Sequence, residues 1–113
     1  MTGVQTCALP IWIGKEEENI KALIAKKGLE NDVFFTGFRQ DIPLLLPELD
    51  LLLFTSTEEA AGGVILESYA CKVPVVATNA GGIPEILKDN ITGFLAEKGN
   101  ADDFAKKDRK SVV

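Results

Sequence analysis

The chain has 113 residues, with 12 lysines and arginines against 17 acidic residues, two cysteines and no histidine. This length predicts a single domain, and the net charge of −5 argues against nucleic acid as a partner. The absence of histidine excludes His-based catalytic triads and the usual zinc ligand sets. Cys7 and Cys71 predict neither a disulfide framework nor a metal site. The sequence shows no apolar run of transmembrane length and no signal peptide.

The two ends of the chain do not have the pattern of a folded protein. Thr2–Ile11 shows neither strand alternation nor a helical stripe, and it corresponds codon by codon to a translated sequencing-library adapter. Asp108–Val113 corresponds in the same way to an adapter at the other end, followed by a stop codon. We therefore predict that residues 1–11 and 108–113 are adapter-encoded, and that residues 12–107 are an internal fragment of a longer gene.

The first part of this fragment predicts a strand, a helix and a second strand. Trp12–Gly14 has the composition of the end of a buried strand. Lys15–Lys27 predicts a helix, with glutamates at its start and lysines at its end as the helix dipole favours. Gly28 is expected to end that helix, and Val33–Thr36 predicts a short buried strand. One helix face carries Ile20, Leu23, Ile24 and Lys27.

Further alternating elements follow. Ile42–Leu46 predicts a short helix that stops at Pro47. Asp50–Phe54 is a continuous apolar run, which is typical of a strand covered on both faces of a parallel sheet. The later elements are expected to be the helix Gly62–Cys71, the strand Val73–Ala77, the helix Ile83–Leu87, the strand Thr92–Ala96 and the helix Ala101–Lys107.

This alternation defines the expected fold class. Five strand–helix units follow one another at intervals of roughly twenty residues, which predicts an α/β domain with a doubly wound parallel sheet, truncated at both ends. Asn100 or Asp102 is expected to cap the last helix. The helix that follows Asp50–Phe54 is expected to turn four residues toward the sheet, namely Val64, Ile65, Leu66 and Tyr69.

The most informative stretch is Thr55–Glu85, because it places two glutamates around a turn of small residues. Glu59 is expected just before a helix and Glu67 about two turns into it, on roughly the same side. The turn Ala60–Gly63 allows backbone N–H groups at a helix start to approach an anion closely. Two carboxylates and an anion site at one helix start indicate a ligand that carries both hydroxyls and phosphate.

The same stretch resembles the donor-nucleotide half of GT-B glycosyltransferases of the retaining group called family 4. Their pattern runs P-S-x-x-E-G-x-G-x-x-x-x-E-A-x-A-x-G-x-P-V-V-A and then G-G-x-x-E. The matching residues are Thr55-Ser56, Glu59, Gly62, Glu67, Ala70, Pro74-Val75-Val76-Ala77, Gly81-Gly82 and Glu85. The chain departs from the pattern at Thr55, where proline is usual, at Ala60-Ala61, and at Lys72, where glycine is usual.

The resemblance implies specific roles for these residues. Glu59 is expected to bind hydroxyls of the donor sugar as the catalytic residue of this lobe, and Glu67 to bind the ribose hydroxyls. Backbone N–H groups of Gly62, Gly63 and Val64 are expected to face the phosphates. In this family the loop that follows the strand ending at Gly-Phe, here Gly37-Phe38, lies beside the nucleobase. Phe38 and Arg39 are therefore expected to contact the base.

The resemblance also implies what the fragment needs to function. The expected activity is that of a hexosyltransferase-type glycosyltransferase, with a nucleotide diphosphate sugar as donor substrate and with neither a cofactor nor a metal. The N-terminal lobe that binds the acceptor is missing, together with an Arg and a Lys that usually clamp the diphosphate. We therefore expect the fragment to be inactive alone, and the parent enzyme to act in the cytoplasm or at the cytoplasmic membrane face.

Other functions remain open at this stage. A non-catalytic α/β nucleotide-binding or regulatory module is the main alternative. A receiver domain would need an acidic cluster at its strand ends, where this chain has Thr55, Thr78 and Gly37. A sugar-nucleotide epimerase has a similar build but typically depends on residues, including histidine, that this chain lacks.

Overall fold

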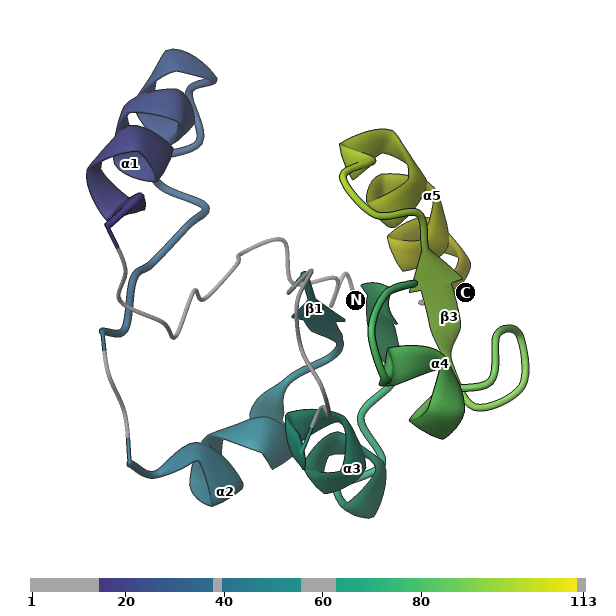
Figure 1. Ribbon diagram of the computed structural model, residues 1–113. Helices are drawn as coiled ribbons and strands as arrows, with labels where there is room; N and C mark the ends of the chain where they lie inside the picture. The colour runs from purple at the N-terminus through teal and green to yellow at the C-terminus, as the bar shows by residue number, and fades with distance from the viewer. Residues whose placement is uncertain (1–14, 38–39, 56–62, 112–113) are drawn as a thin grey trace. The chain divides into compact units, whose positions relative to one another are not determined.

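The computed structural model describes residues 15–37, 40–55 and 63–111. The chain forms two compact units, Met1–Ile42 and Pro43–Val113, and each is described here by itself. Figure 1 shows the helices and strands of both. The strand predicted at Trp12–Gly14 lies outside the described residues.

The first unit contains the predicted helix, α1 (Glu17–Lys26), which begins with Glu17 and Glu18 and has Lys26 in its last turn. The helix is followed by Gly28, which has a φ of +70°. The amide of Leu29 donates to the carbonyl of Ile24 at 2.9 Å, and that of Gly28 donates to Ala25 at 3.1 Å. These two bonds form a Schellman motif, so the prediction that Gly28 ends this helix is confirmed.

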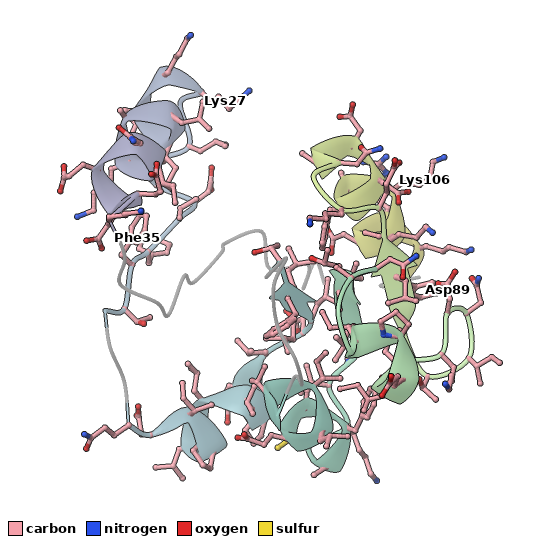
Figure 2. The ribbon with its side chains drawn as sticks, in the orientation of Figure 1. Lys27, Phe35, Asp89 and Lys106 are labelled. Atoms are coloured by element: carbon pink, nitrogen blue, oxygen red, sulfur yellow. The ribbon has the colours of Figure 1, made fainter. Side chains whose placement is uncertain are left out.

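The apolar residues of the first unit are less covered than the sequence predicts. Within the described residues, α1 has no buried residue, and Leu23 of its predicted inner face is 51% exposed. The strand predicted at Val33–Thr36 is wrong for the described structure, which shows a single bridge residue at Val33 and no strand. Phe35, labelled in Figure 2, is half-buried, and the centre of its ring lies 5.3 Å from the Lys21 Nζ atom.

From Ile42 onward the helices and strands follow the predicted order. They are α2 (Ile42–Leu45), the 3₁₀ helix η1 (Leu46–Glu48), β1 (Leu52–Phe54), α3 (Gly63–Ala70), β2 (Val75–Thr78), α4 (Ile83–Ile86), β3 (Phe94–Ala96) and α5 (Ala101–Ser111). Several predicted boundaries differ from the observed ones by one or two residues, and two predictions of where a helix ends are wrong. Pro47 lies inside η1 instead of stopping a helix, because proline is tolerated in a first helical turn. The last helix continues past Lys107 to Ser111.

The described strands form one parallel sheet in the order β1-β2-β3. Leu53 pairs with Val76, and Ala77 pairs with Leu95, which fixes the register on both sides of β2. The helix α3 connects β1 to β2, and α4 lies between β2 and β3. Parallel strands joined through helices are the predicted α/β architecture, which is confirmed for this unit.

The central strand β2 is buried on both faces. All four of its residues are buried. On one face Val75 and Ala77 belong to the core cluster, together with Ile65 of α3 and Ile83 of α4. Val76 and Thr78 point to the opposite face because side chains alternate along a strand, and α5 contacts β2 and β3 there. Helices therefore cover both faces, as a doubly wound sheet requires.

The inner face of α3 differs from the prediction at two positions. Ile65 is fully buried, and Val64 and Tyr69 are half-buried, as expected. Leu66 was predicted to face the sheet but is 54% exposed, whereas Ser68 is fully buried. Ser68 lies three residues after Ile65 and shares its face. Its hydroxyl has no hydrogen-bond partner among the described residues.

Gly93 allows its loop to lie very close to the backbone of β2. A Cβ atom on Gly93 would lie 2.8 Å from the carbonyl oxygen of Val75 and 3.1 Å from Cδ1 of Leu87. The loop before Gly93 is fixed by Thr92, whose hydroxyl oxygen accepts from the Lys88 amide at 2.8 Å and from the Tyr69 hydroxyl at 3.2 Å. The loop and the central strand therefore have no room for a side chain between them.

We predict that Gly93→Ala lowers the free energy of unfolding by about 2 kcal/mol, because the added methyl group overlaps a backbone oxygen that cannot move alone. Denaturant unfolding followed by circular dichroism measures this change. The control is Gly63→Ala, where no described atom lies within 4 Å of the added carbon. The control should change stability by no more than about 0.5 kcal/mol, and an equal loss in both variants would contradict the prediction.

The departure from the family pattern at Lys72 has a structural consequence. Lys72 has a φ of +60°, the left-handed conformation in which glycine is favoured. The amide of Val73 donates to Ser68 at 2.9 Å and that of Lys72 donates to Tyr69 at 3.0 Å. These bonds form a second Schellman motif at the end of α3, in which a lysine occupies the position that usually holds glycine.

We predict that Lys72→Gly raises the free energy of unfolding by about 1 kcal/mol, because it removes the strain of a side chain in the left-handed region. Thermal and denaturant unfolding measure the gain. Lys72→Ala is the matched control, since it removes the charge but keeps a Cβ atom in the same conformation. A similar gain in Lys72→Ala would show that the charge, and not the backbone, is responsible.

Candidate functional site at the carboxyl edge of the sheet

The loops that carry the predicted site residues leave the sheet at one edge. Because β1, β2 and β3 are parallel, their carboxyl ends lie together. Thr55 follows β1, Asn79 follows β2 and Glu97 follows β3. In open α/β sheets this is the edge at which ligands bind. The helix α3 begins beyond the same edge, at Gly63.

The start of α3 provides open space and unpaired amides. The first N–H groups of a helix have no partner within it, and here they belong to Gly63 and Val64. No described atom lies within 4 Å of the place where a Cβ atom of Gly63 would stand. A ligand can therefore approach this backbone closely, as the sequence predicts for a phosphate.

Glu67 lies four residues after Gly63, on the same side of α3 and about one turn further along. The sequence predicted about two turns, so that estimate was wrong for the described helix. The Glu67 side chain is exposed. Its carboxylate makes no hydrogen bond or ion pair within the described part of the chain. Glu67 is therefore free to accept hydrogen bonds from a ligand bound at the start of α3.

Four other predicted site residues lie outside the described residues. They are Glu59 and Gly62, which precede α3 in the sequence, and Phe38 and Arg39, which precede α2. Their predicted roles stay predictions. Of the predicted set, the structure brings together Gly63, Val64 and Glu67.

The glycine pair after β2 forms a turn that leads into α4. Gly81 has a φ of +56°, and Gly82 is the N-cap of α4. The amide of Ile83 donates to Ala80 at 3.2 Å, which closes the turn. Glu85 lies in the first turn of α4 and is exposed. This geometry gives the pair a structural role in turning the chain at the ligand edge.

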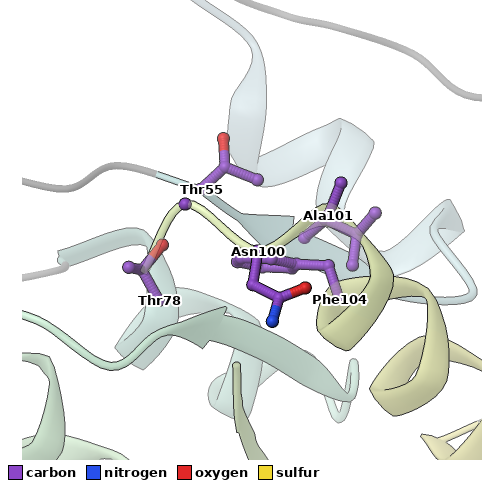
Figure 3. A pocket seen from close by; sticks show the side chains of 7 residues that line it. Thr55, Thr78, Asn100, Ala101 and Phe104 are labelled. Atoms are coloured by element: carbon purple, nitrogen blue, oxygen red, sulfur yellow. The ribbon is translucent and has the colours of Figure 1, made fainter. Parts of the chain in front are cut away.

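The sequence did not predict a hollow of about 330 Å³ at this edge. Figure 3 shows Thr55 and Thr78 from the strand ends on one side of it, and Asn100, Ala101 and Phe104 from the start of α5 on the other. Leu53 and Gly99 complete the lining. For Thr55 and Thr78 the sequence signal is their position at the carboxyl ends of predicted strands.

Two polar side chains of this hollow, those of Thr78 and Asn100, are already engaged within the protein. The Thr78 hydroxyl donates to the carbonyl of Phe54 at 3.2 Å. The Asn100 Oδ1 atom accepts from the Asp103 amide at 2.9 Å, which confirms Asn100 as a cap of α5. Asn100 also donates to Glu97 at 3.0 Å. The hollow is consequently a largely apolar recess beside the sheet, and the start of α3 remains the better ligand site.

The described residues lack two other kinds of feature. They contain no group of three or more histidine, cysteine or acidic residues arranged to hold a metal ion. They also contain no helix long and apolar enough to cross a membrane.

A parallel sheet covered on both faces, with an open helix start at its carboxyl edge, is the architecture of GT-B glycosyltransferase lobes. Consistent with this, the family model of the glycosyl transferases group 1 matches residues 8–111. The chain belongs to this family. The N-acetyl-alpha-D-glucosaminyl L-malate synthase of Bacillus anthracis is 37% identical to it over 100 residues, which are 88% of this chain and 26% of the relative.

Solved structures show the same relationship. The crystal structure of Anabaena HepE in complex with UDP matches 95% of this chain and 31% of its own, with a TM-score of 0.85 and 37% identity. HepE has also been solved with UDP-glucose, and that structure matches with a TM-score of 0.83 and 34% identity. The C-terminal domain of LpcC from Francisella tularensis, a group 1 glycosyl transferase, matches 83% of this chain with a TM-score of 0.76 and 31% identity.

The matched regions are only parts of these proteins. The chain spans 26% of the Bacillus relative and 31% of HepE. It also spans 50% of the LpcC domain. This chain therefore corresponds to only a part of such proteins.

Proposed function

We propose that this chain is the donor-nucleotide-binding part of a retaining glycosyltransferase of the family 4 type, which transfers a hexose from a nucleotide diphosphate sugar to an acceptor. The observation that carries the proposal is the exposed, unpaired carboxylate of Glu67 beside the open start of α3. The likeness to HepE, solved with UDP and with UDP-glucose, supports the same ligand class for this chain.

The diphosphate of the donor would lie at the start of α3. The amides of Gly63 and Val64 point out of the first turn, where the helix dipole is positive. Transfer of the sugar leaves growing negative charge on the diphosphate, and fixed N–H donors stabilise such charge without reorganising. The phosphate would occupy the space in front of Gly63, where no described atom lies within 4 Å of the place of a Cβ atom. A side chain at this position would narrow that space.

Glu67 would bind the ribose of the nucleotide. A carboxylate accepts hydrogen bonds through two oxygens and therefore matches two neighbouring hydroxyl groups. Glu67 lies about one helical turn from Gly63 on the same side, and a ribose follows the phosphate at a similar spacing in a nucleotide. Because the carboxylate has no partner in the described structure, binding would not require an existing ion pair to break.

The residues outside the described structure complete this proposal. Glu59 would contact hydroxyls of the donor sugar and so orient the reacting carbon. The Gly62 amide would join those of the start of α3, and Phe38 and Arg39 would contact the nucleobase. These roles come from the family resemblance.

We further propose that the chain by itself does not catalyse transfer. The acceptor-binding lobe would have to close over the donor to orient the acceptor toward the anomeric carbon. The parent enzyme would need no cofactor, since the donor itself carries the activated sugar. It would act in the cytoplasm or at the cytoplasmic face of the membrane.

We predict that the chain binds one of UDP, GDP and ADP saturably, and that Glu67→Gln weakens this binding about tenfold or more, because a charge-assisted hydrogen bond becomes a neutral one. Isothermal calorimetry measures the affinity. The control is Glu85→Gln, which removes an exposed carboxylate from the first turn of α4 and should leave the affinity within about twofold.

The possible results distinguish the proposed function from its alternatives. Equal weakening in both variants would mean that net charge alone attracts the nucleotide, and would remove the ribose role of Glu67. A folded chain that binds none of the three nucleotides would contradict the proposal for this chain. Tight nucleotide binding together with unchanged affinity in Glu67→Gln would favour a nucleotide-binding module of another kind.

We predict that the chain alone hydrolyses or transfers sugar from UDP-glucose at no more than the buffer rate, because the lobe that positions an acceptor is needed for the reaction. A coupled assay for UDP release measures this rate. Release of UDP above the buffer rate, abolished by Glu59→Ala, would contradict the expected inactivity of the isolated chain.

A further inference from the structure

The side chain of Asn79 stands at the carboxyl edge of the sheet and is not used by the fold. Asn79 directly follows β2, and its side chain is exposed. Its carboxamide makes no hydrogen bond within the described part of the chain. Two other polar side chains of this edge, those of Thr78 and Asn100, bind the Phe54 carbonyl and the Asp103 amide. Asn79 is therefore available to a ligand, whereas these two side chains hold the fold together.

The backbone of Asn79 is nevertheless fixed. The Asn79 amide donates to the carbonyl of Ala96 at 2.8 Å, which continues the pairing of β2 with β3. The amide of Ala80 donates to Thr78 at 3.0 Å, and that of Ile83 donates to Ala80 at 3.2 Å. These bonds hold the chain on both sides of Asn79. A free carboxamide on a fixed backbone can bind a ligand without the entropic cost of ordering a loop.

The alternation of side chains places Asn79 on the side of the sheet where α3 begins. Val75 and Ala77 belong to the core cluster with Ile65 of α3, and Asn79 is the next residue on the same face of β2. Asn79 lies two residues beyond Ala77, about 7 Å further toward the carboxyl edge. Gly63 lies two residues before Ile65, only about 3 Å in that direction. Asn79 therefore stands beyond the helix start, at the level of a ligand bound there.

A carboxamide matches one part of the proposed donor better than the others. Its NH₂ group donates hydrogen bonds and its oxygen accepts them. Phosphate oxygens only accept, and in the proposed function they are bound by the amides of Gly63 and Val64. Glu67 in turn binds the ribose. The remaining part, the hexose, is uncharged and offers hydroxyl groups that both donate and accept, so that a neutral amide is a suitable partner.

We propose that Asn79 binds a hydroxyl group of the transferred hexose and thereby takes part in selecting the sugar. The proposal rests on the proposed function, which places the diphosphate at the start of α3. Hexoses differ in the orientation of single hydroxyl groups. A site that hydrogen-bonds one such group discriminates against a sugar that lacks it, because the polar group of the site is then left unpaired.

The test compares each nucleotide with its nucleotide sugar on the full chain. Calorimetry measures the affinities of UDP and UDP-glucose, of GDP and GDP-mannose, and of ADP and ADP-glucose. For the pair that binds, Asn79→Ala should weaken the nucleotide sugar about fivefold, through the loss of one neutral hydrogen bond, and leave the nucleotide within about twofold. The Asn79 side chain makes no bond in the fold, and circular dichroism checks that the variant is folded.

Asn90→Gly is the matched control. It also removes an exposed asparagine side chain, but from the loop before β3, at the opposite edge of the sheet. Glycine suits this position because Asn90 has a φ of +64°. Asn90→Gly should leave the affinities of both the nucleotide and the nucleotide sugar unchanged.

A second measurement identifies the hydroxyl group. Analogues of the bound nucleotide sugar, each lacking one hydroxyl of the hexose, are titrated into the wild-type chain and into Asn79→Ala. One analogue should bind the wild-type chain about fivefold more weakly than the complete nucleotide sugar does. The same analogue and the complete nucleotide sugar should bind Asn79→Ala equally, as expected when the two partners of one contact are removed in a double-mutant cycle.

Other results would overturn the proposal. If folded Asn79→Ala binds the nucleotide sugar as tightly as the wild-type chain does, Asn79 makes no contact with the hexose. Equal weakening of the nucleotide and the nucleotide sugar would mean that Asn79 binds the nucleotide part instead. Both results leave the proposed function intact, because the wild-type chain still binds a nucleotide. A wild-type chain that binds no nucleotide would contradict the proposed function, and the role of Asn79 with it.

Discussion

The structure depends on the burial of β2 on both of its faces. Its four residues lie between α3 and α4 on one side and α5 on the other, and none of them is exposed. A strand in this position is mainly apolar, and its one polar side chain, Thr78, is paired with the Phe54 carbonyl. Parallel strands that are covered on both faces send their connections over the faces of the sheet. The loops consequently gather at the carboxyl edge. The close contact of Gly93 with this strand shows how little space its surroundings leave.

The same constraint explains which predictions could be made from the sequence. The apolar run in Val73–Ala77 and the helix pattern in Gly62–Cys71 are local signals, and the structure has a strand at Val75–Thr78 and a helix at Gly63–Ala70. Within the described residues no strand forms at Val33–Thr36, because a strand needs a neighbour to pair with and a local pattern does not supply one. Leu66 is exposed although it was predicted to face the sheet, because three successive apolar residues, Val64 to Leu66, cannot all lie on one face of a helix.

The sequence could predict those parts of the candidate site that depend only on the spacing of residues along one helix. Glu67 and Gly63 share one side of α3 because of helical spacing alone, and the openness around Gly63 follows from its place at the helix start. The hollow beside Leu53 could not be predicted, because it depends on how α5 lies against the strands. Lys72 illustrates a third case. The family pattern shows that lysine is unusual at this position. Only the φ angle shows the consequence, which is a side chain in the left-handed backbone conformation.

The central claim is that the start of α3 holds the nucleotide diphosphate and Glu67 its ribose. The most direct test is a titration of the ¹⁵N-labelled chain with UDP, in which the backbone amide shifts are followed by NMR. The account predicts that the largest shifts occur at Gly63, Val64 and Glu67, and that the amides of Asp89 to Gly93 are unchanged. Shifts confined to the hollow at Asn100 and Phe104, with none at the start of α3, would contradict it.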